Sequence, residues 1–365
     1  MDAFFDKINL EMLQDKTSKL CGNSLFTLLK KADTEQNCNY YIRKNVKGDF
    51  TPKSEESKYF YQDIQNHIRL SAKKCHQMVV QFPNRKITIN FISIDNNTIN
   101  VYEYIEYLLL WFKLMNMISN NNINKRLFIS IYATPFKKEL PSSTEMLTSK
   151  HINSGYTYPC MDNGNIVIYR KEEWFKVLLH ESIHSFCLDF SQMNQDIMAS
   201  QVTGAYVSTP LYSETYAELW AEMLQCAMLS FFQSEKKQYN FSLYFDFYCH
   251  LEYIHSVSIV SNILSYYGIS FNELREKILI HQDTHVYEYY ILKTILFSDY
   301  NAFIAWCLNH NNKTIISFTK TYENCLDFCE LINQCYKRCD YNEMISAQDK
   351  NLTHNSLAMS LIEIV

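Results

Sequence analysis

The sequence predicts an α+β, helix-rich protein, and three observations carry this prediction. The 365 residues include only six glycines and six prolines, which is too few for the many tight turns of an all-β architecture. Strand-like alternation of apolar and polar residues is found in the first half of the chain. From about residue 211 onward, nearly every segment has helical periodicity. We therefore expect a small mixed sheet packed against a larger set of helices.

The composition is that of a folded globular protein, with 47% hydrophobic and 20% charged residues. The formal net charge of −5 argues against a protein that binds nucleic acid by neutralising phosphates. Charged residues interrupt both the N-terminal segment and the most apolar stretch, 102–118, so we expect neither a signal peptide nor a membrane span. These features predict a cytoplasmic protein with no nucleic-acid or membrane partner, and with its twelve cysteines as reduced thiols.

Three regions are expected along the chain. Residues 1–85 are predicted to be helical with polar connections, as a subdomain, a lid or a propeptide. Residues 86–340 are predicted to form the main domain, which carries the chemistry described below. Residues 341–365 are predicted to be a polar C-terminal tail.

The main domain begins with the strand candidates. Segments 86–95 and 126–133 alternate apolar with polar residues, and the helix predicted at 102–118 connects them. A third apolar segment, 165–170, directly precedes a long helical segment, 171–190. Further helices are predicted at about 211–232, 242–265, 270–282, 285–296 and 313–338.

The segment 171–190 contains the motif His-Glu-Ser-Ile-His at positions 180–184. Because positions i and i+4 lie on one face of a helix, His180 and His184 can reach one metal ion. Glu181 is rotated by about 100° to the side, where its carboxylate can take a proton from a zinc-activated water. The alternative is a pair of structural histidines that bind nothing. One helix also supplies only two of the three protein ligands that a catalytic zinc needs.

The third ligand is predicted on the next helix, which opens with Glu214 and Glu218 in another i, i+4 pair. One carboxylate can bind the metal while the other accepts a hydrogen bond from the far ring nitrogen of a ligand histidine. A shifted register, with Glu218 as the ligand and Glu222 behind it, fits almost equally well. The alternative without a metal is a solvated acidic helix face.

An HExxH helix, a loop and then a helix opening with E-x-x-x-[DE] resembles the gluzincin branch of zinc metallopeptidases, the thermolysin-like and M1 aminopeptidase-like enzymes. The resemblance covers roughly residues 126–230. It implies a zincin-like domain that holds one zinc ion per chain, with His180, His184 and Glu214 as ligands. It also implies Glu181 as the catalytic base and Glu218 behind a ligand. The expected reaction is hydrolysis of a peptide or protein substrate.

The sequence also departs from related patterns. Cys187 and Phe190 stand where the metzincin signature HExxHxxGxxH needs Gly and His. The GxMEN-type motif that anchors a free substrate N-terminus in M1 aminopeptidases is missing, which puts an aminopeptidase activity in doubt. The segments SGYTYP and IYRKEEWFKVLLHESIH additionally resemble those of uncharacterised proteins of large DNA viruses.

Candidates to stabilise the oxyanion of the transition state lie downstream of the third ligand. His285 and Tyr287 are the first choices, with His250 and His255 behind them. The chain has 27 tyrosines, so a purely structural role is the alternative for each aromatic candidate.

Two further clusters complete the list of candidate sites. Asn153 and Gly155 precede the apolar segment 165–170, where a peptide could add to the sheet by backbone pairing, although an ordinary loop is the alternative. The cysteines of a C-x₃-C-x₅-C-x₃-C run are expected to be buried free thiols, because the central gap is short for a structural zinc site. They are Cys325, Cys329, Cys335 and Cys339.

The sequence therefore predicts a zinc-dependent metallopeptidase. The alternative is a catalytically inactive zincin-like protein that binds zinc or a partner. Glu181 speaks against that alternative, because a purely structural zinc site has no use for a base. The substrate, the choice between endopeptidase and exopeptidase, and the oligomeric state stay open.

Overall fold

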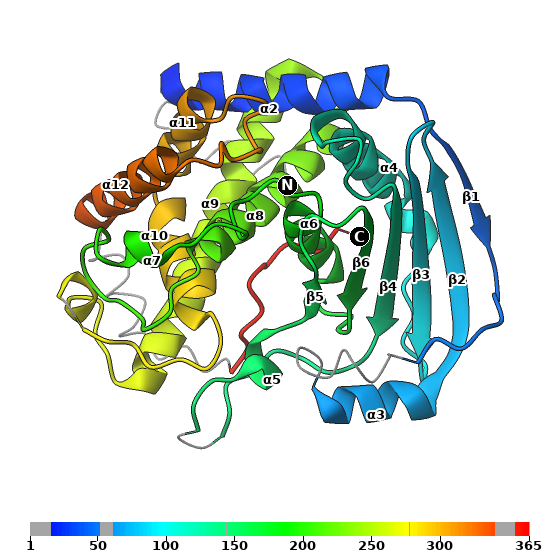
Figure 1. Cartoon of the computed structure of the whole chain (residues 1–365), viewed down its shortest axis with the longest axis horizontal. Helices are drawn as coiled ribbons and strands as arrows, with labels where there is room; N and C mark the ends of the chain where they lie inside the picture. The colour runs from blue at the N-terminus through cyan, green and yellow to red at the C-terminus, as the bar shows by residue number, and fades with distance from the viewer. Residues whose placement is uncertain (1–15, 52–60, 143–144, 277, 340–354, 365) are drawn as a thin grey trace, which may run out of the picture.

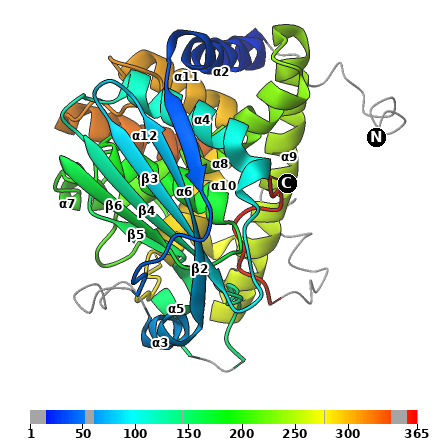
Figure 2. The same ribbon diagram turned by 90° about the vertical axis from the view of Figure 1, so that its right-hand side faces the viewer.

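The structure is a computed structural model that describes residues 16–51, 61–142, 145–276, 278–339 and 355–364. A mixed sheet lies to one side of a large group of helices, and helix α2 (Lys16–Glu35) crosses one end of both (Figures 1 and 2). This arrangement confirms the predicted α+β, helix-rich class. The predictions for residues 1–15 and 341–354 fall outside the described residues.

Six strands form the sheet, in the order β1-β2-β3-β4-β6-β5. They are β1 Asn39–Arg43, β2 Ala72–Gln81, β3 Lys86–Ile94, β4 Arg126–Ala133, β5 Gly155–Thr157 and β6 Asn163–Ile168. The pairs β3·β4 and β4·β6 are parallel, and the other neighbouring pairs are antiparallel. The short strand β5 therefore lies at the edge of the sheet, next to β6.

The three predicted strands correspond to β3, β4 and β6. The prediction of helices throughout residues 1–80 is wrong for β1 and β2. Polar residues interrupt the alternation of β2, AKKCHQMVVQ, so its own pattern is weak. Its pairing along most of its length with β3, through the register Gln81↔Lys86, decides its conformation instead.

The helical elements of the described chain follow the sequence in this order. They are α2 Lys16–Glu35, α3 Gln62–Ser71, α4 Val101–Ile118, α5 Ser149–Ile152, α6 Trp174–Ser185, α7 Asp196–Ala199, α8 Tyr212–Gln233, α9 Gln238–Tyr267, the 3₁₀ turn η3 Glu273–Arg275, the π-helix η4 Tyr287–Leu292, α10 Lys293–Phe297, α11 Tyr300–His310 and α12 Tyr322–Arg338.

Most of the predicted helices are present, but the helix expected at 270–282 is wrong. Of the residues described in this stretch, Glu273–Arg275 form the short turn η3, and residues 278–280 lie beside Tyr206. The amide of Tyr206 donates to the carbonyl of Ile278, and the amide of Ile280 donates to the carbonyl of Tyr206. These backbone hydrogen bonds to a distant loop replace the helical ones.

Helix α6 lies at the centre of the protein. It contacts β5 and β6 on one side and α8 on the other, and every residue from Trp174 to Ser185 is buried. Trp111 of α4 donates from its indole Nε1 to Ser182 Oγ at 3.2 Å, which satisfies two polar groups in this interior. Any group presented by α6 therefore faces a packed environment from which water is largely excluded.

The prediction that all twelve cysteines are reduced is wrong for one pair. Cys160, in the turn before β6, and Cys187, just after α6, form a disulfide. Because β6 leads into α6 and the chain then turns back, two residues separated by 27 positions meet, which spacing alone does not reveal. The other ten cysteines are not disulfide-bonded.

The prediction of a polar C-terminal tail is wrong for the described residues 355–364. Leu357, Met359, Ser360 and Ile364 are buried. This segment returns to the interior beside α6 (Figure 1), where the side chain of Ser360 donates a hydrogen bond to Glu252.

The sequence predicted no membrane-spanning helix. Among the described residues, no single helix is long and apolar enough to cross a membrane. One pair of helical segments, Tyr287–Phe297 and Tyr300–His310, meets the length and composition test together, and the two are bent by 95°.

Candidate metal centre

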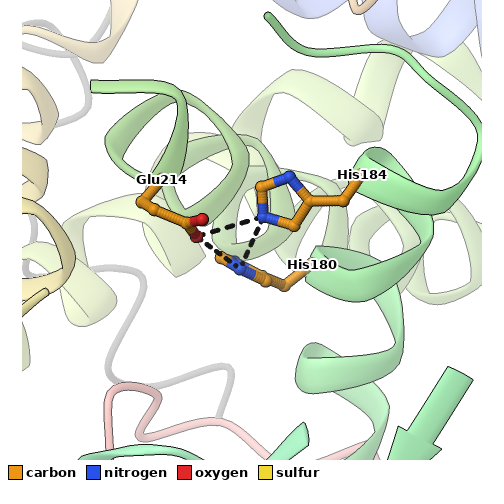
Figure 3. Close-up of side chains that lie close together, drawn as sticks. All are labelled: His180, His184 and Glu214. Atoms are coloured by element: carbon orange, nitrogen blue, oxygen red, sulfur yellow. Dashed lines mark hydrogen bonds and ion pairs between the residues drawn. The ribbon is translucent and has the colours of Figure 1, made fainter. Parts of the chain in front are cut away.

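Three predicted ligands converge between α6 and α8 (Figure 3). The Nε2 atoms of His180 and His184 are 3.1 Å apart. Glu214 Oε2 lies 3.2 Å from His180 Nε2 and 3.1 Å from His184 Nε2. Two imidazole nitrogens and one carboxylate oxygen that meet so closely form a group that could hold a metal ion.

Helical spacing explains this convergence. His180 and His184 are one turn apart on α6, and Glu214 lies in the first turn of α8, which packs against α6. A donor set of two histidines and one glutamate is typical of catalytic zinc, because three protein ligands leave one position for a reacting molecule. The residues present therefore fit zinc.

His180, His184 and Glu214 form a triad whose members differ in charge. Burial lowers the pKa of His180 to about 4, so this imidazole is neutral at pH 7, which is the form that binds a metal. Although burial opposes it, the carboxylates of Glu214 and Asp189 hold the pKa of His184 well above its usual value. Against the effect of burial, His184 and His180 hold the pKa of Glu214 well below its usual value. The carboxylate is therefore ionised, as a ligand must be.

Each imidazole has a carboxylate at its far nitrogen. Glu218 Oε2 lies 2.8 Å from His180 Nδ1, and Asp189 Oδ2 lies 2.6 Å from His184 Nδ1. A carboxylate in this position fixes the orientation of a ligand histidine and the nitrogen that carries its proton. This geometry favours Glu214 over Glu218 as the third ligand, because Glu218 lies behind His180.

Asp189 was not identified from the sequence. It follows α6, where the chain turns back through Cys187 in the left-handed conformation, with φ of 63°. The amide of Leu188 donates to the carbonyl of Ile183 at 2.9 Å, which ends the helix. This turn brings Asp189 beneath His184, and the only sequence signal for it is an acidic residue shortly after the motif.

A buried lysine stands behind Glu218. Lys176 Nζ forms an ion pair with Glu218 Oε1, and both side chains are almost completely buried. Burial lowers the pKa of Lys176 to about 7, against the opposing effect of Glu173. The carboxylate behind His180 is thus itself held by a charged partner inside the protein.

Glu181 lies beside the triad and faces the edge strand β5. A Cβ placed on Gly155 would lie 3.3 Å from Glu181 Oε1, so only glycine leaves this carboxylate its full space. Glu181 lines a small cavity of about 30 Å³ together with residues of β5, α6 and the C-terminal segment. Burial raises its pKa to about 8, which is in the range of a base that works near neutral pH.

The downstream candidates His285 and Tyr287 are placed differently from each other. Tyr287 is buried away from the triad, where its hydroxyl donates to the carbonyl of Ala205 and lies 3.1 Å from Tyr336 Oη. His285 is part exposed, and its ring centre lies 5.8 Å from that of Tyr289. The structure does not bring Tyr287 to the three ligands.

Tyr289 is the aromatic residue that does reach the site. Its ring centre lies 5.7 Å from that of His180, and its side chain hydrogen-bonds Glu214. It also lines the cavity beside Glu181. It lies on the π-helix η4, whose wider turn changes which residues share a face, and helical spacing from the sequence does not anticipate this.

The remaining candidates lie elsewhere or have other partners. His255 Nε2 contacts the carbonyl of Ala358 at 2.8 Å, and His250 is exposed. Asn153 Oδ1 accepts a hydrogen bond from Thr284 at 2.9 Å, while the residue itself lines the cavity beside Glu181. The cysteines of the C-x₃-C-x₅-C-x₃-C run are confirmed as buried thiols outside any disulfide.

Comparison of the chain with family models, curated proteins and solved structures finds no match. The gluzincin resemblance therefore rests on the motif residues and on the His180, His184 and Glu214 group.

Proposed function

We propose that this protein is a zinc-dependent metallopeptidase. The observation that carries the proposal is the convergence of His180, His184 and Glu214, with the Glu181 carboxylate beside them. A zinc ion bound there would polarise the scissile carbonyl and acidify the attacking water. A zinc hydrolase needs both the three metal ligands and a base, whereas a structural zinc site needs no base.

Glu181 is the proposed general base. It takes a proton from the attacking water and later passes that proton to the leaving amine. Its raised pKa follows from its burial, and nearby positive charge lowers that pKa, so the carboxylate can cycle between its two forms near pH 7. Gly155 keeps the space in front of Glu181 open.

Tyr289 is the proposed donor to the oxyanion. Its hydroxyl already hydrogen-bonds Glu214, so it lies within reach of a substrate carbonyl placed at the triad. Desolvation, and then the Glu214 carboxylate, raise the pKa of Tyr289 well above its usual value and keep the hydroxyl protonated as a donor.

The edge strand β5 is the proposed binding site for the peptide backbone. Among the strands that the structure describes, β5 is last in the sheet order, next to β6, and an extended peptide would add beside it by backbone pairing. Residues Asn153 to Gly155 line the cavity that also contains Glu181. A peptide added to β5 would therefore pass the proposed base.

Hydrolysis of a quenched fluorescent peptide library by the zinc-loaded protein tests this proposal. We expect turnover in the wild type, and a loss of about 10²–10⁴-fold for Glu181→Gln, which is nearly isosteric but cannot accept the proton. Tyr289→Phe should lower kcat by about 10²–10³-fold. Equal turnover in wild type and Glu181→Gln would overturn the proposal and leave a zinc-binding or interaction protein.

A further inference from the structure

The C-terminal segment 355–364 forms part of the wall of the proposed active site. In Figure 1 it runs from the region of α5 to the side of α6. Its first residues run beside residues 138–140. The amide of Leu140 donates to the carbonyl of Asn355 at 2.7 Å. The amide of Leu357 in turn donates to the carbonyl of Lys138 at 2.9 Å.

Buried carboxylates hold the rest of this segment in place. Glu173 accepts a hydrogen bond from the amide of Ser360 at 2.5 Å. Glu252 accepts from the amides of Leu361 and Ile362 at 2.9 and 2.8 Å. With anchors on both sides of it, Met359 has a fixed backbone position.

Met359 faces the site. It is 4% exposed and lines the same cavity as Glu181, Gly155 and Tyr289. Its Sδ atom lies 3.3 Å from Lys176 Nζ. A residue near the end of the chain thus closes the cavity that opens beside the proposed base.

The size of this cavity limits what can enter it. Its volume is about 30 Å³, far below the roughly 300–1,000 Å³ of a pocket that holds a whole ligand. A small side chain therefore fits this space better than that of leucine or phenylalanine. Met359 is the one long, unbranched and uncharged side chain in the lining of this cavity, so a shorter side chain at this position would enlarge the space.

We propose that Met359 determines substrate specificity, and that the substrates are peptides with a small side chain, Gly, Ala or Ser, next to the scissile bond. The proposal rests on the proposed peptidase function. Shortening Met359 enlarges the cavity without touching the triad or Glu181, so it should admit larger side chains.

Cleavage of two matched peptide libraries, each varying one residue that flanks the scissile bond, tests this. For wild type we expect a preference for small residues of about 10–100-fold in kcat/KM over Leu and Phe, the usual discrimination of a pocket that is too small. In Met359→Ala this preference should fall at least tenfold at one of the two positions. Met198→Ala is the matched control, because Met198 is equally buried but does not line the cavity.

Peptide binding to inactive Glu181→Gln protein gives a second readout. Adding Met359→Ala should tighten binding of the Leu peptide relative to the Ala peptide by a similar factor. If Met359→Ala does not fold, as judged by circular dichroism, Met359→Val should change the peptide preference in the same direction by a smaller factor. An unchanged preference in a folded variant that still cleaves peptides overturns this inference alone. No cleavage of any peptide by the zinc-loaded wild type overturns the proposed function, and this inference with it.

Discussion

His180 and His184 both contact Glu214 through Nε2, but different parts of the chain support the two rings from behind. Behind His180, the carboxylate of Glu218 comes from α8 and forms an ion pair with the buried Lys176. Behind His184, the carboxylate of Asp189 comes from the loop after α6. The first support is built from two packed helices. The second depends on the path of a loop.

The loop that carries Asp189 is held in place through Cys187. Cys187 lies between His184 and Asp189, takes a left-handed backbone conformation and is bonded to Cys160. Lys320 Nζ donates to Cys187 Sγ at 2.9 Å. A non-glycine residue in this conformation carries backbone strain, so the covalent link and Lys320 help to keep the turn. Helix packing therefore orients His180, while a cross-linked turn orients His184.

The largest expected effect concerns the His180 side. Lys176→Met removes the partner of Glu218 and leaves a buried carboxylate without its ion pair. We expect the free energy of unfolding to fall by about 3–5 kcal/mol, measured by urea denaturation of the metal-free protein. Lys320→Met, on the His184 side, is the control and should cost less than about 1 kcal/mol, because Lys320 is more exposed. Equal losses in the two variants would contradict the comparison.

Reduction of the disulfide acts on the other side. It releases a closed loop with a sequence separation of 27, for which the chain-entropy estimate is roughly 3 kcal/mol of stability. It should also weaken zinc binding through Asp189, measured by competition with a chromophoric chelator. The double variant Cys160→Ser/Cys187→Ser should bind zinc as the reduced protein does, whatever the redox state of the buffer. Unchanged zinc affinity after reduction would show that the turn holds Asp189 without the disulfide.

The two carboxylates can be compared directly. Glu218→Gln and Asp189→Asn should each lower zinc affinity by about 10–100-fold, because each removes the charge behind a ligand histidine. Only Glu218→Gln should also destabilise the metal-free protein strongly, since it leaves Lys176 without its carboxylate. Calorimetric zinc titration and thermal unfolding check the two parts. A strong loss of stability in Asp189→Asn would mean that both supports belong to one buried network.

The smallest expected effect concerns Glu252, which holds the C-terminal segment on the His180 side. Burial, and then Glu222, raise its pKa from 4.5 to about 7. Between these values the unfolded chain loses this proton while the folded protein keeps it, so the group makes stability fall as pH rises from about 4.5 to 7. Glu252→Gln should lose this part of the pH dependence, whose slope is at most about 1.4 kcal/mol per pH unit. Parallel pH profiles of unfolding for wild type and variant would contradict this assignment.

The sequence predicted those parts of the site that depend on local helical spacing. His180 and His184 are an i, i+4 pair on α6, and Glu214 lies in the first turn of α8, so helical spacing was enough to predict the three residues that the structure brings together. The strands β3, β4 and β6 were predicted because their apolar residues alternate.

The remaining parts depend on tertiary structure. Asp189 reaches His184 through a turn at a left-handed cysteine, and Tyr289 reaches Glu214 through a π-helix that shifts the register from Tyr287. Met359 comes from a segment that was predicted to be a tail because its sequence is polar. Its backbone amides instead donate hydrogen bonds to buried carboxylates that are distant in the sequence. None of these contacts is encoded by spacing within one element.

Zinc content of the purified protein tests the central claim most directly. We predict one zinc ion per chain for wild type, and at least a hundredfold weaker binding for His180→Ala and Glu214→Ala, because each removes one of three ligands. His310→Ala is the control, since His310 lies on α11 outside the triad, and it should keep the ion. Full zinc occupancy in folded His180→Ala and Glu214→Ala proteins, or no zinc in wild type, would contradict the account.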